Sequence, residues 1–507
     1  MFSDTQTRLS WKQRGLFVTL GLGLALGQAP FNLSFGYFLI LPFFFWLLQQ
    51  FPNGRMGFGA GWWMGVGYFA LLFTWVIEPF LVDAAVTGWM APIALAAMAS
   101  GFALFYAVPT YLACRIWFQH PSRIFGFIFL FITAEYIRSY LWTGFPWGHL
   151  SYAFIDMPFI QITSVFGIHL SLSIFLLALS LPVTLGLRPR DGAVWMLVIF
   201  GLLSVFGGIR QLGEHPNHSS DTSVRLVQPN AAQHLKWRPE YRERFYARQL
   251  LYTQAGVTDR PDIIIWPETA IYYPYKDGSP ELQQIADAAG PSSSVLAGIV
   301  RWTDSTPRNT AIYLDPAGGI SAIYDKHHLV PFGEFVPFGE QLSGLGLRPL
   351  VDTVANFSAG AGPQVIKGGN VPDFLPLICY EAIFPHNTMM DGTRAEWIVH
   401  ITNDAWFGTF SGPFQHLAQT RMRAIEQGLP IARVANTGIS AMIDPFGRIT
   451  HRIELGEENW MDVKLPAPLP KTFYAIWGDW PLVLVLALLL AFALFPQGFI
   501  RNSTDNS

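Results

Sequence analysis

Apolar residues in the first 210 positions are grouped into long runs. Seven of these runs approach the roughly 20 residues that a helix needs to cross a bilayer. They lie near 15–31, 36–52, 57–80, 86–113, 124–142, 157–187 and 193–209. A further run follows near 480–499, in WPLVLVLALLLAFALFPQGF. The pattern predicts a multi-pass α-helical membrane domain over 1–210 and an eighth membrane helix over 478–500.

Positive charge is confined to alternate loops between these runs. Lysine and arginine precede the first run and follow the second, fourth and sixth runs, at Lys12, Arg14, Arg55, Arg115, Arg123, Arg188 and Arg190. The loops near 32–35, 78–85 and 143–156 contain neither residue. Because cytoplasmic loops carry the excess of positive charge, both termini should be cytoplasmic and the segment between spans seven and eight extracytoplasmic. The first run is then an uncleaved span rather than a signal peptide.

The pattern changes after a polar linker at 210–222. Over 223–465, short β-rich runs alternate with amphipathic helical patterns, which predicts a layered α/β domain. The expected strands are 224–229, 262–267, 295–300, 310–315, 320–325, 375–380, 397–402 and 439–444. The expected helices are 239–255, 280–289 and 414–427.

Composition supports this division into two parts. The chain is 51% hydrophobic and 13% charged, whereas soluble domains average about 25% charged residues. Only 16 of its 32 Lys or Arg and 35 Asp or Glu residues lie in the first 210 positions. A net charge of −3 provides no basic surface for nucleic acid, so no such partner is expected. We expect a monomer.

The chain contains two cysteines, which the predicted topology places on opposite sides of the membrane. Cys114 lies at the cytoplasmic end of the fourth span and is interpreted as a small buried hydrophobic residue. Cys379 ends a predicted strand of the external domain. An unpaired cysteine in an oxidising compartment is either buried or used, and for Cys379 alone the two alternatives are about even.

Charged neighbours favour a nucleophilic role for Cys379. Glu268 in IIIWPETA, Lys326 in YDKHHLVPFGE and Glu381 in LICYEAIFP each follow or border a predicted strand. Side chains at the carboxyl ends of strands in an α/β domain converge on one crevice. A thiol is mostly protonated at neutral pH, so it needs a base or a nearby positive charge. Glu268 can supply the base, and Lys326 can supply the charge.

The ordered motifs WPE, K-x-x-L-V-P-F-G-E and C-Y-E resemble those of the Glu-Lys-Cys hydrolase superfamily of nitrilases and aliphatic amidases. With about eight spans, the chain is similar to the apolipoprotein N-acyltransferase family. That similarity includes GFPWGHL at 144–150, LKW at 235–237, NDAWFG at 403–408 and RVANTGIS at 433–440. It implies an αββα sandwich for the predicted α/β domain.

The resemblance also implies a role for each matching residue. Cys379 would be the nucleophile, Glu268 the general base and Lys326 the stabiliser of the oxyanion. Glu334 matches an additional carboxylate beside this triad. Tyr380 and Glu381 match residues flanking the nucleophile, and Trp237 matches an aromatic position near the lipid entrance.

The implied reaction is a two-step acyl transfer in the bacterial inner membrane. A fatty acyl chain would pass from a phospholipid to a thioester on the cysteine, and then to the α-amino group of the S-diacylglyceryl cysteine of an apolipoprotein. This is the last step of lipoprotein maturation, with the catalytic domain on the periplasmic side. Neither a metal nor an organic cofactor is required.

Two other functions compete with this interpretation. A membrane-anchored amide or nitrile hydrolase would use the same triad with water as the acyl acceptor, but a simple anchor needs one span rather than seven. A transporter with an external binding domain is disfavoured because the spans show little intramembrane charge and no pseudo-symmetric halves.

Several other residues receive structural interpretations. His327, His328 and His400 match no zinc spacing, so we expect structural or solvated side chains. Trp147 and His149 should anchor an external loop at the membrane interface. Other expected features are a Glu135–Arg138 pair one helical turn apart, a solvated helix face bearing Arg421, Arg423 and Glu426, and a mobile apolar lid over 339–362.

Overall fold

The computed structural model describes residues 7–117, 122–184, 188–212, 221–256, 260–273, 275, 279–303, 305–342, 356–389 and 392–494. The chain divides into two compact units. The first unit comprises Met1–Ile77, Trp89–Leu212 and Ile476–Ser507, and the second comprises Glu78–Gly88 and Gly213–Ala475. The short helices α4 (Glu78–Leu81) and α5 (Ala84–Thr87) therefore pack with the second unit, although they lie within the first 210 positions.

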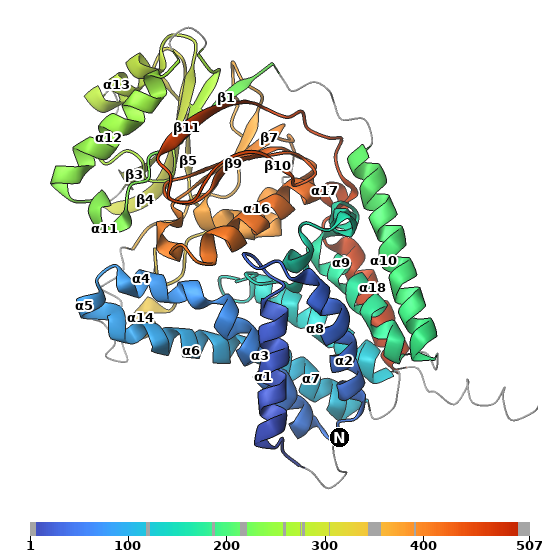
Figure 1. Ribbon diagram of the computed structural model, residues 1–507. Coiled ribbons are helices and arrows are strands. Elements are labelled where there is room, and N and C mark those ends of the chain that lie inside the picture. Colours follow the sequence, from blue (N-terminus) through green and yellow to red (C-terminus); the bar gives the residue numbers. More distant parts are fainter. Residues whose placement is uncertain are drawn as a thin grey trace, which may run out of the picture. The chain divides into compact units, whose positions relative to one another are not determined.

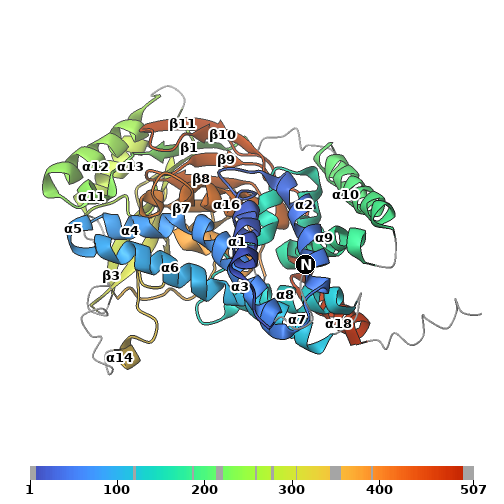
Figure 2. The ribbon, with the colours of Figure 1, turned by 60° about the horizontal axis from the view of Figure 1, so that its bottom comes forward.

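The first unit is built from apolar helices. Its main helices are α1 (Trp11–Ala25), α2 (Tyr37–Gln49), α3 (Gly54–Leu72), α6 (Ala91–Phe102), α7 (Leu104–Ile116), α8 (Ser122–Tyr140), α9 (Thr163–Ser180), α10 (Pro189–Leu212) and α18 (Trp480–Leu494). Helix α3 packs against both α1 and α7 (Figure 2). A Cβ atom on Gly61 of α3 would lie 2.5 Å from the Tyr106 carbonyl oxygen of α7. Small residues permit such close helix packing in membrane proteins.

Three helical segments are long and apolar enough to cross a membrane within the described residues. They are Ala84–Ile116, Pro158–Val183 and Pro189–Leu212. A fourth candidate joins Gly54–Leu72 to Thr74–Leu81 across a 61° bend, and Ser34–Gln49 and Trp480–Leu494 are shorter apolar helices. The first unit is thus a helical unit with membrane-spanning character, and the count of eight spans stays a prediction.

A buried ion pair organises the interior of this unit. Arg138 and Glu135 of α8 pair through both guanidinium and carboxylate branches, at 3.2 and 2.5 Å, as expected. Arg138 also donates to the carbonyl oxygens of Phe145 and Trp147, at 2.6 and 2.8 Å. Trp147 and His149 are fully buried, so the prediction that they anchor an exposed loop is wrong. The carbonyl groups of this loop are buried because they accept hydrogen bonds from Arg138, and a buried guanidinium needs several acceptors.

The second unit contains two β-sheets. The first contains β1 (Ser223–Gln228), β2 (Ile263–Ile265), β3 (Ser294–Thr303), β4 (Thr306–Leu314), β5 (Ile320–Asp325) and β11 (Asn459–Lys464), in the order β11-β1-β2-β3-β4-β5. The second contains β6 (Phe374–Ile378), β7 (Trp397–Thr402), β8 (Ile431–Ala435), β9 (Ser440–Ile443) and β10 (Ile449–Ile453), in the order β10-β9-β8-β7-β6. In each sheet three neighbouring strands are parallel, β1-β2-β3 and β6-β7-β8, and antiparallel strands complete the sheet.

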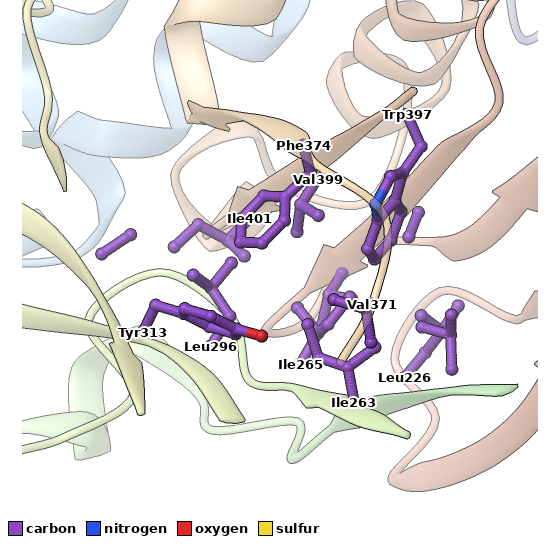
Figure 3. Packing of buried hydrophobic residues seen from close by; sticks show 14 of the residues in the cluster. Leu226, Ile263, Ile265, Leu296, Tyr313, Val371, Phe374, Trp397, Val399 and Ile401 are labelled. Carbon is purple, nitrogen blue, oxygen red and sulfur yellow. The ribbon is translucent and has the colours of Figure 1, made fainter. Parts of the chain in front are cut away.

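Three hydrophobic cores separate four layers. The central core joins the facing sides of the two sheets, where Ile265 and Leu296 of the first sheet face Phe374 and Val399 of the second (Figure 3). A second core lies between the first sheet and helices α12 (Pro239–Gln254) and α13 (Pro280–Ala289) (Figure 1). The third packs the second sheet against α16 (Gly412–Gln427). The unit is therefore the expected αββα sandwich, since each sheet buries both faces.

The eight predicted strands and three predicted helices of this unit are confirmed to within a few residues. Three strands had no prediction: β8, β10 and β11. Strands β10 (ITHRI) and β11 (NWMDVK) each carry several exposed residues, so neither presents a clear apolar run. Strand β8 is fully buried, but Arg433 interrupts its five-residue run.

Candidate active site

Glu268 follows β2 in a turn that is tightly enclosed. Asn309 Nδ2 donates to one carboxylate oxygen at 2.6 Å, and the backbone N–H of Asn403 donates to the other at 2.8 Å. Gly298 of β3 lies against the turn, where a Cβ atom would be 2.7 Å from Glu268 Cα. These contacts hold the carboxylate in one orientation with 6% of the residue exposed.

Lys326 follows β5 and is buried between two carboxylates. Its Nζ atom lies 2.9 Å from Glu334 and 3.6 Å from Oε1 of Glu268. Burial alone would lower the pKa of Lys326, but the charges of Glu334 and Glu268 outweigh it and hold the pKa well above its ordinary value. The lysine is therefore a fixed cation.

Asn309 of β4 links the two carboxylates and was missed by sequence reasoning. Its Nδ2 group donates to Glu268 at 2.6 Å and to Glu334 at 2.9 Å, while its backbone carbonyl oxygen accepts from the backbone N–H of Lys326 at 2.8 Å. An asparagine next to a predicted strand gave no signal of its own. Its contribution is visible only in the folded structure, where its side chain binds both Glu268 and Glu334.

Cys379 occupies the first position after β6, where the chain enters the short helix Cys379–Ile383. Its φ of 51° lies in the left-handed region, which is sparsely populated by residues other than glycine and costs free energy. The prediction that Cys379 ends the strand is displaced by one residue, because β6 ends at Ile378 and the short helix begins at Cys379.

The thiol of Cys379 is protonated in the resting protein. Burial and the negative charge of Glu268 raise the pKa of this thiol, and the opposing charge of Lys326 does not cancel their effect. The charges of Glu268 and Lys326 thus both affect the pKa of the thiol. A protonated thiol next to a held carboxylate needs that carboxylate as a base before it can attack a carbonyl group.

Glu381 fastens the turn that carries Cys379. One carboxylate oxygen accepts from the backbone N–H of Ile378 at 2.7 Å, and the other accepts from the backbone N–H of His327 at 2.8 Å. The Tyr324 hydroxyl donates to the same carboxylate at 3.0 Å. Glu381 thus joins the segment after β5, which bears Lys326, to the turn after β6.

Tyr380 and Trp237 lie in different surroundings. Tyr380 is buried, with its ring 5.6 Å from that of His328 and 5.0 Å from that of Phe384. Trp237 is 51% exposed and its ring lies 6.0 Å from that of Tyr272. Tyr380 therefore contributes to packing beside Cys379, whereas Trp237 leaves about half of its surface exposed.

Lys236, next to Trp237, is a buried lysine that sequence reasoning did not single out. Its ammonium group donates to Thr269 Oγ1 at 2.6 Å and to the carbonyl oxygen of Glu268 at 3.3 Å. Burial lowers the pKa of Lys236 to about 8, against the opposing effect of Glu268. Glu268 therefore has a second buried lysine close to it, which contacts its backbone carbonyl group.

The structure corrects the interpretation of helix α16. Arg423 and Glu426 are fully buried and pair at 2.9 Å, so the prediction that they form a solvated face is wrong. Both long side chains fall on a face that the rest of the unit covers. His400 is fully buried and His327 lies 2.7 Å from Glu381, which fits the structural alternative expected for these two histidines.

Two further expectations concern a metal and a lid. Among the described residues, no group of three or more His, Cys, Asp or Glu side chains is arranged to hold a metal ion. Most of the proposed lid at 339–362, namely 343–355, lies outside the described residues.

The four-layer fold and the Glu268, Lys326 and Cys379 cluster define a carbon-nitrogen hydrolase-type domain. The family model described as Carbon-nitrogen hydrolase matches residues 224–468, and the Apolipoprotein N-acyltransferase N-terminal domain model matches residues 20–181.

Whole-chain relatives identify the family more narrowly. Apolipoprotein N-acyltransferase from Brucella melitensis is 36% identical, with 95% of each chain covered. Those from Rhodopseudomonas palustris and Bradyrhizobium diazoefficiens are 35% and 36% identical, each match covering 96% of this chain and 95% of the relative. The chain belongs to the apolipoprotein N-acyltransferase family and is an acyltransferase.

Proposed function

We propose that this acyltransferase moves a fatty acyl chain from a phospholipid to the α-amino group of the S-diacylglyceryl cysteine of an apolipoprotein, with Cys379 as the intermediate carrier. The observation that supports the residue assignment is the buried cluster in which Lys326 contacts Glu268 and Glu334, together with the effect of the Glu268 and Lys326 charges on the pKa of the Cys379 thiol. Membership of the family supports the transfer reaction.

The first half-reaction loads the enzyme. Glu268 accepts the thiol proton of Cys379, and the sulfur attacks the ester carbonyl carbon of the phospholipid. The carbonyl oxygen becomes an oxyanion, which the Lys326 ammonium and backbone N–H groups stabilise. The ester C–O bond then breaks, Glu268 returns the proton to the departing lysophospholipid, and a thioester remains on Cys379.

The second half-reaction transfers the chain. The neutral amine of the acceptor attacks the thioester carbonyl, a second oxyanion forms beside Lys326, and the C–S bond breaks. The amine proton passes through Glu268 to the departing Cys379 sulfur, which restores the resting thiol. Splitting one difficult acyl transfer into two steps is the usual gain of covalent catalysis. No metal or organic cofactor enters either step.

Glu334 and Glu381 have supporting roles in this proposal. Glu334 shares Lys326 and Asn309 with Glu268, so it keeps the lysine charged and placed. Glu381 holds the nucleophile turn. Trp237, exposed beside the base, is assigned to contact with the incoming lipid.

We also propose the predicted membrane arrangement, with about eight spans over 1–210 and 478–500 and a periplasmic catalytic domain over 223–465. It rests on the alternation of Lys and Arg between loops. Impermeant thiol labels applied to intact spheroplasts should modify His451→Cys in the catalytic domain and spare His120→Cys. The reverse pattern would invert the arrangement.

Hydrolysis is the competing outcome for the thioester, since water can replace the amine. The family membership of the whole chain, including its N-terminal part, does not favour that alternative.

An intact-mass experiment tests the carrier role. With phospholipid and no acceptor, the purified protein should gain one acyl chain, and a diacylglyceryl lipopeptide should remove it as N-acylated product. Cys379→Ala should never gain the chain, whereas Cys114→Ala, which changes the other cysteine, should behave like the unmodified protein. Initial rates should give the parallel double-reciprocal lines of a ping-pong scheme. Intersecting lines without any adduct would remove Cys379 from this role.

A further inference from the structure

Two histidines meet at the backbone carbonyl of the nucleophile. Nε2 of His400, in β7, lies 3.1 Å from the carbonyl oxygen of Cys379, and Nε2 of His416, in α16, lies 3.2 Å from the same oxygen. Both side chains are fully buried. One donor is enough to satisfy a buried carbonyl group, so the second imidazole needs another explanation.

Hydrogen-bond chemistry fixes the orientation of both rings. A carbonyl oxygen can only accept, so each Nε2 atom must carry a proton. A guanidinium can only donate, and Arg433 approaches Nδ1 of His400 at 3.0 Å and Nδ1 of His416 at 3.3 Å. Burial and the charge of Arg433 lower the pKa of both histidines. Each ring therefore aims its Nε2–H group at the same carbonyl oxygen, while Nδ1 of His416 faces both Arg433 at 3.3 Å and the Asp404 carboxylate at 3.0 Å.

Asp404 completes the support behind the rings. Its carboxylate accepts from Arg433 Nη2 at 2.5 Å and from the Thr402 hydroxyl at 2.9 Å, and it lies 3.0 Å from Nδ1 of His416. Arg433 is fully buried and balanced by this charge. The cluster spans β7, the short helix Asp404–Phe407, α16 and β8, so four elements of the fold contribute to the placement of one carbonyl group.

That carbonyl group belongs to the peptide between Cys379 and Tyr380. A peptide unit is planar and its C=O and N–H bonds point in opposite directions. Fixing the oxygen from two sides therefore fixes the direction of the Tyr380 N–H, and donors on the oxygen polarise the N–H as well. The left-handed φ of Cys379, 51°, is a conformation that the surroundings must enforce.

We infer that His400 and His416 are positioning residues, which together aim the Tyr380 N–H at the oxyanion formed on the acyl carbonyl group. The inference rests on the proposed acyl transfer through Cys379. The turn that carries Cys379 is then positioned in two ways. Glu381 binds the backbone N–H groups of Ile378 and His327, and the two histidines orient the peptide group between Cys379 and Tyr380.

The experiment compares two reactions of the same thiol. Acylation by phospholipid forms an oxyanion, whereas alkylation by iodoacetamide displaces iodide from a saturated carbon and forms none. The variants are His400→Leu with His416→Leu, singly and together, and the matched Gln substitutions, whose carboxamide can present an N–H near the position of Nε2. Acylation is followed by intact mass at saturating phospholipid, and alkylation by the same method.

Because the two donors share one acceptor, each single Leu variant should lose only a few-fold in acylation rate. The double Leu variant should lose about 100-fold, near the effect of removing one oxyanion donor, while alkylation changes less than about twofold. The double Gln variant should recover at least about tenfold. Unchanged acylation, or alkylation that falls in parallel with it, would overturn the inference.

A folding control keeps this test decisive. Should the double Leu variant not fold, the contrast between His416→Leu and His416→Gln in the His400→Gln background measures the loss of one of the two donors, which should slow acylation a few-fold, and equal acylation rates there would also overturn the inference. Failure of the proposed function is distinct, because it would appear as no acyl adduct on the unmodified protein.

Discussion

Replacing Lys326 by methionine removes the cation from a buried cluster of two acids. Lys326 is 1% exposed, and its Nζ atom lies 2.9 Å from Glu334 and 3.6 Å from Glu268. Methionine keeps much of the side-chain length and apolar volume. The substitution therefore leaves Asn309 as the remaining side-chain link between two carboxylates that no longer have their shared counter-ion.

Lys326→Met should lower two quantities: the free energy of unfolding and the rate of acylation. Removing one partner of a buried ion pair typically costs about 3–5 kcal/mol of unfolding free energy. For a unit of this size, that lowers Tm by roughly 10 °C. Loss of an oxyanion donor lowers the acylation rate by about 10²–10³. Lys326→Arg should also acylate poorly, because a planar guanidinium does not replace a compact ammonium.

A double-mutant cycle separates these two effects. Adding Glu334→Gln to Lys326→Met removes one of the stranded charges, so Tm should recover by several degrees while acylation stays lost. Coupling of about 1–3 kcal/mol is expected for residues in direct contact. The assays are thermal unfolding in detergent and intact-mass detection of the adduct. Lys367→Met is the matched control, because Lys367 pairs with Asp373 at the surface and exposed pairs contribute little.

The pH dependence adds a further check. Lys326 has a folded-state pKa above its ordinary value of 10.5, so its stabilising contribution is fully present below pH 10.5 and is lost only at higher pH. The Tm difference between the unmodified protein and Lys326→Met should thus be constant from pH 6 to 9. Near-normal acylation by Lys326→Met, or no recovery of Tm in the double variant, would refute the reasoning.

Three other substitutions test neighbouring parts of the site. Gly298→Ala would place a Cβ atom 2.5 Å from the Thr269 amide nitrogen, so the adduct should form at least about tenfold more slowly; an unaltered rate would show that the base turn tolerates displacement. Glu381→Gln places a side-chain NH2 group, which cannot accept, opposite backbone N–H donors. Each unsatisfied group should cost about 1–3 kcal/mol, so both Tm and the acylation rate should fall. An unchanged Tm would show that Glu381 does not hold the two segments together. Lys236 has a folded pKa of about 8, lowered by burial from 10.5, so the unfolded chain binds more protons between those values. The unmodified protein should therefore gain stability relative to Lys236→Met as pH rises from 7.5 to 9.5, and a constant Tm difference would show that burial does not lower the pKa of Lys236.

Local sequence pattern predicted much of the α/β unit because its elements are individually marked. The run DIIIWP precedes Glu268 and the run LPLICY contains Cys379, and each ends close to where the regular strand ends. Helices α12 and α13 begin at prolines 239 and 280, a position that suits the first helical turn. Strand ends at one edge of a sheet account for Glu268 and Lys326, which follow β2 and β5 of the first sheet, whereas Cys379 follows β6 of the second sheet and meets them only through the packing of the two sheets.

The sequence by itself thus determined where the apolar runs, most strands and the candidate catalytic side chains occur, because each depends on a pattern of a few neighbouring residues. The tertiary structure alone decided which polar residues are covered. Asn309 meets Glu268 across 41 positions, and His416 meets the carbonyl oxygen of Cys379 across 37. Arg423 and Trp147 looked suited to a surface, yet both are buried. Burial depends on what packs against a side chain, and that partner comes from distant parts of the chain.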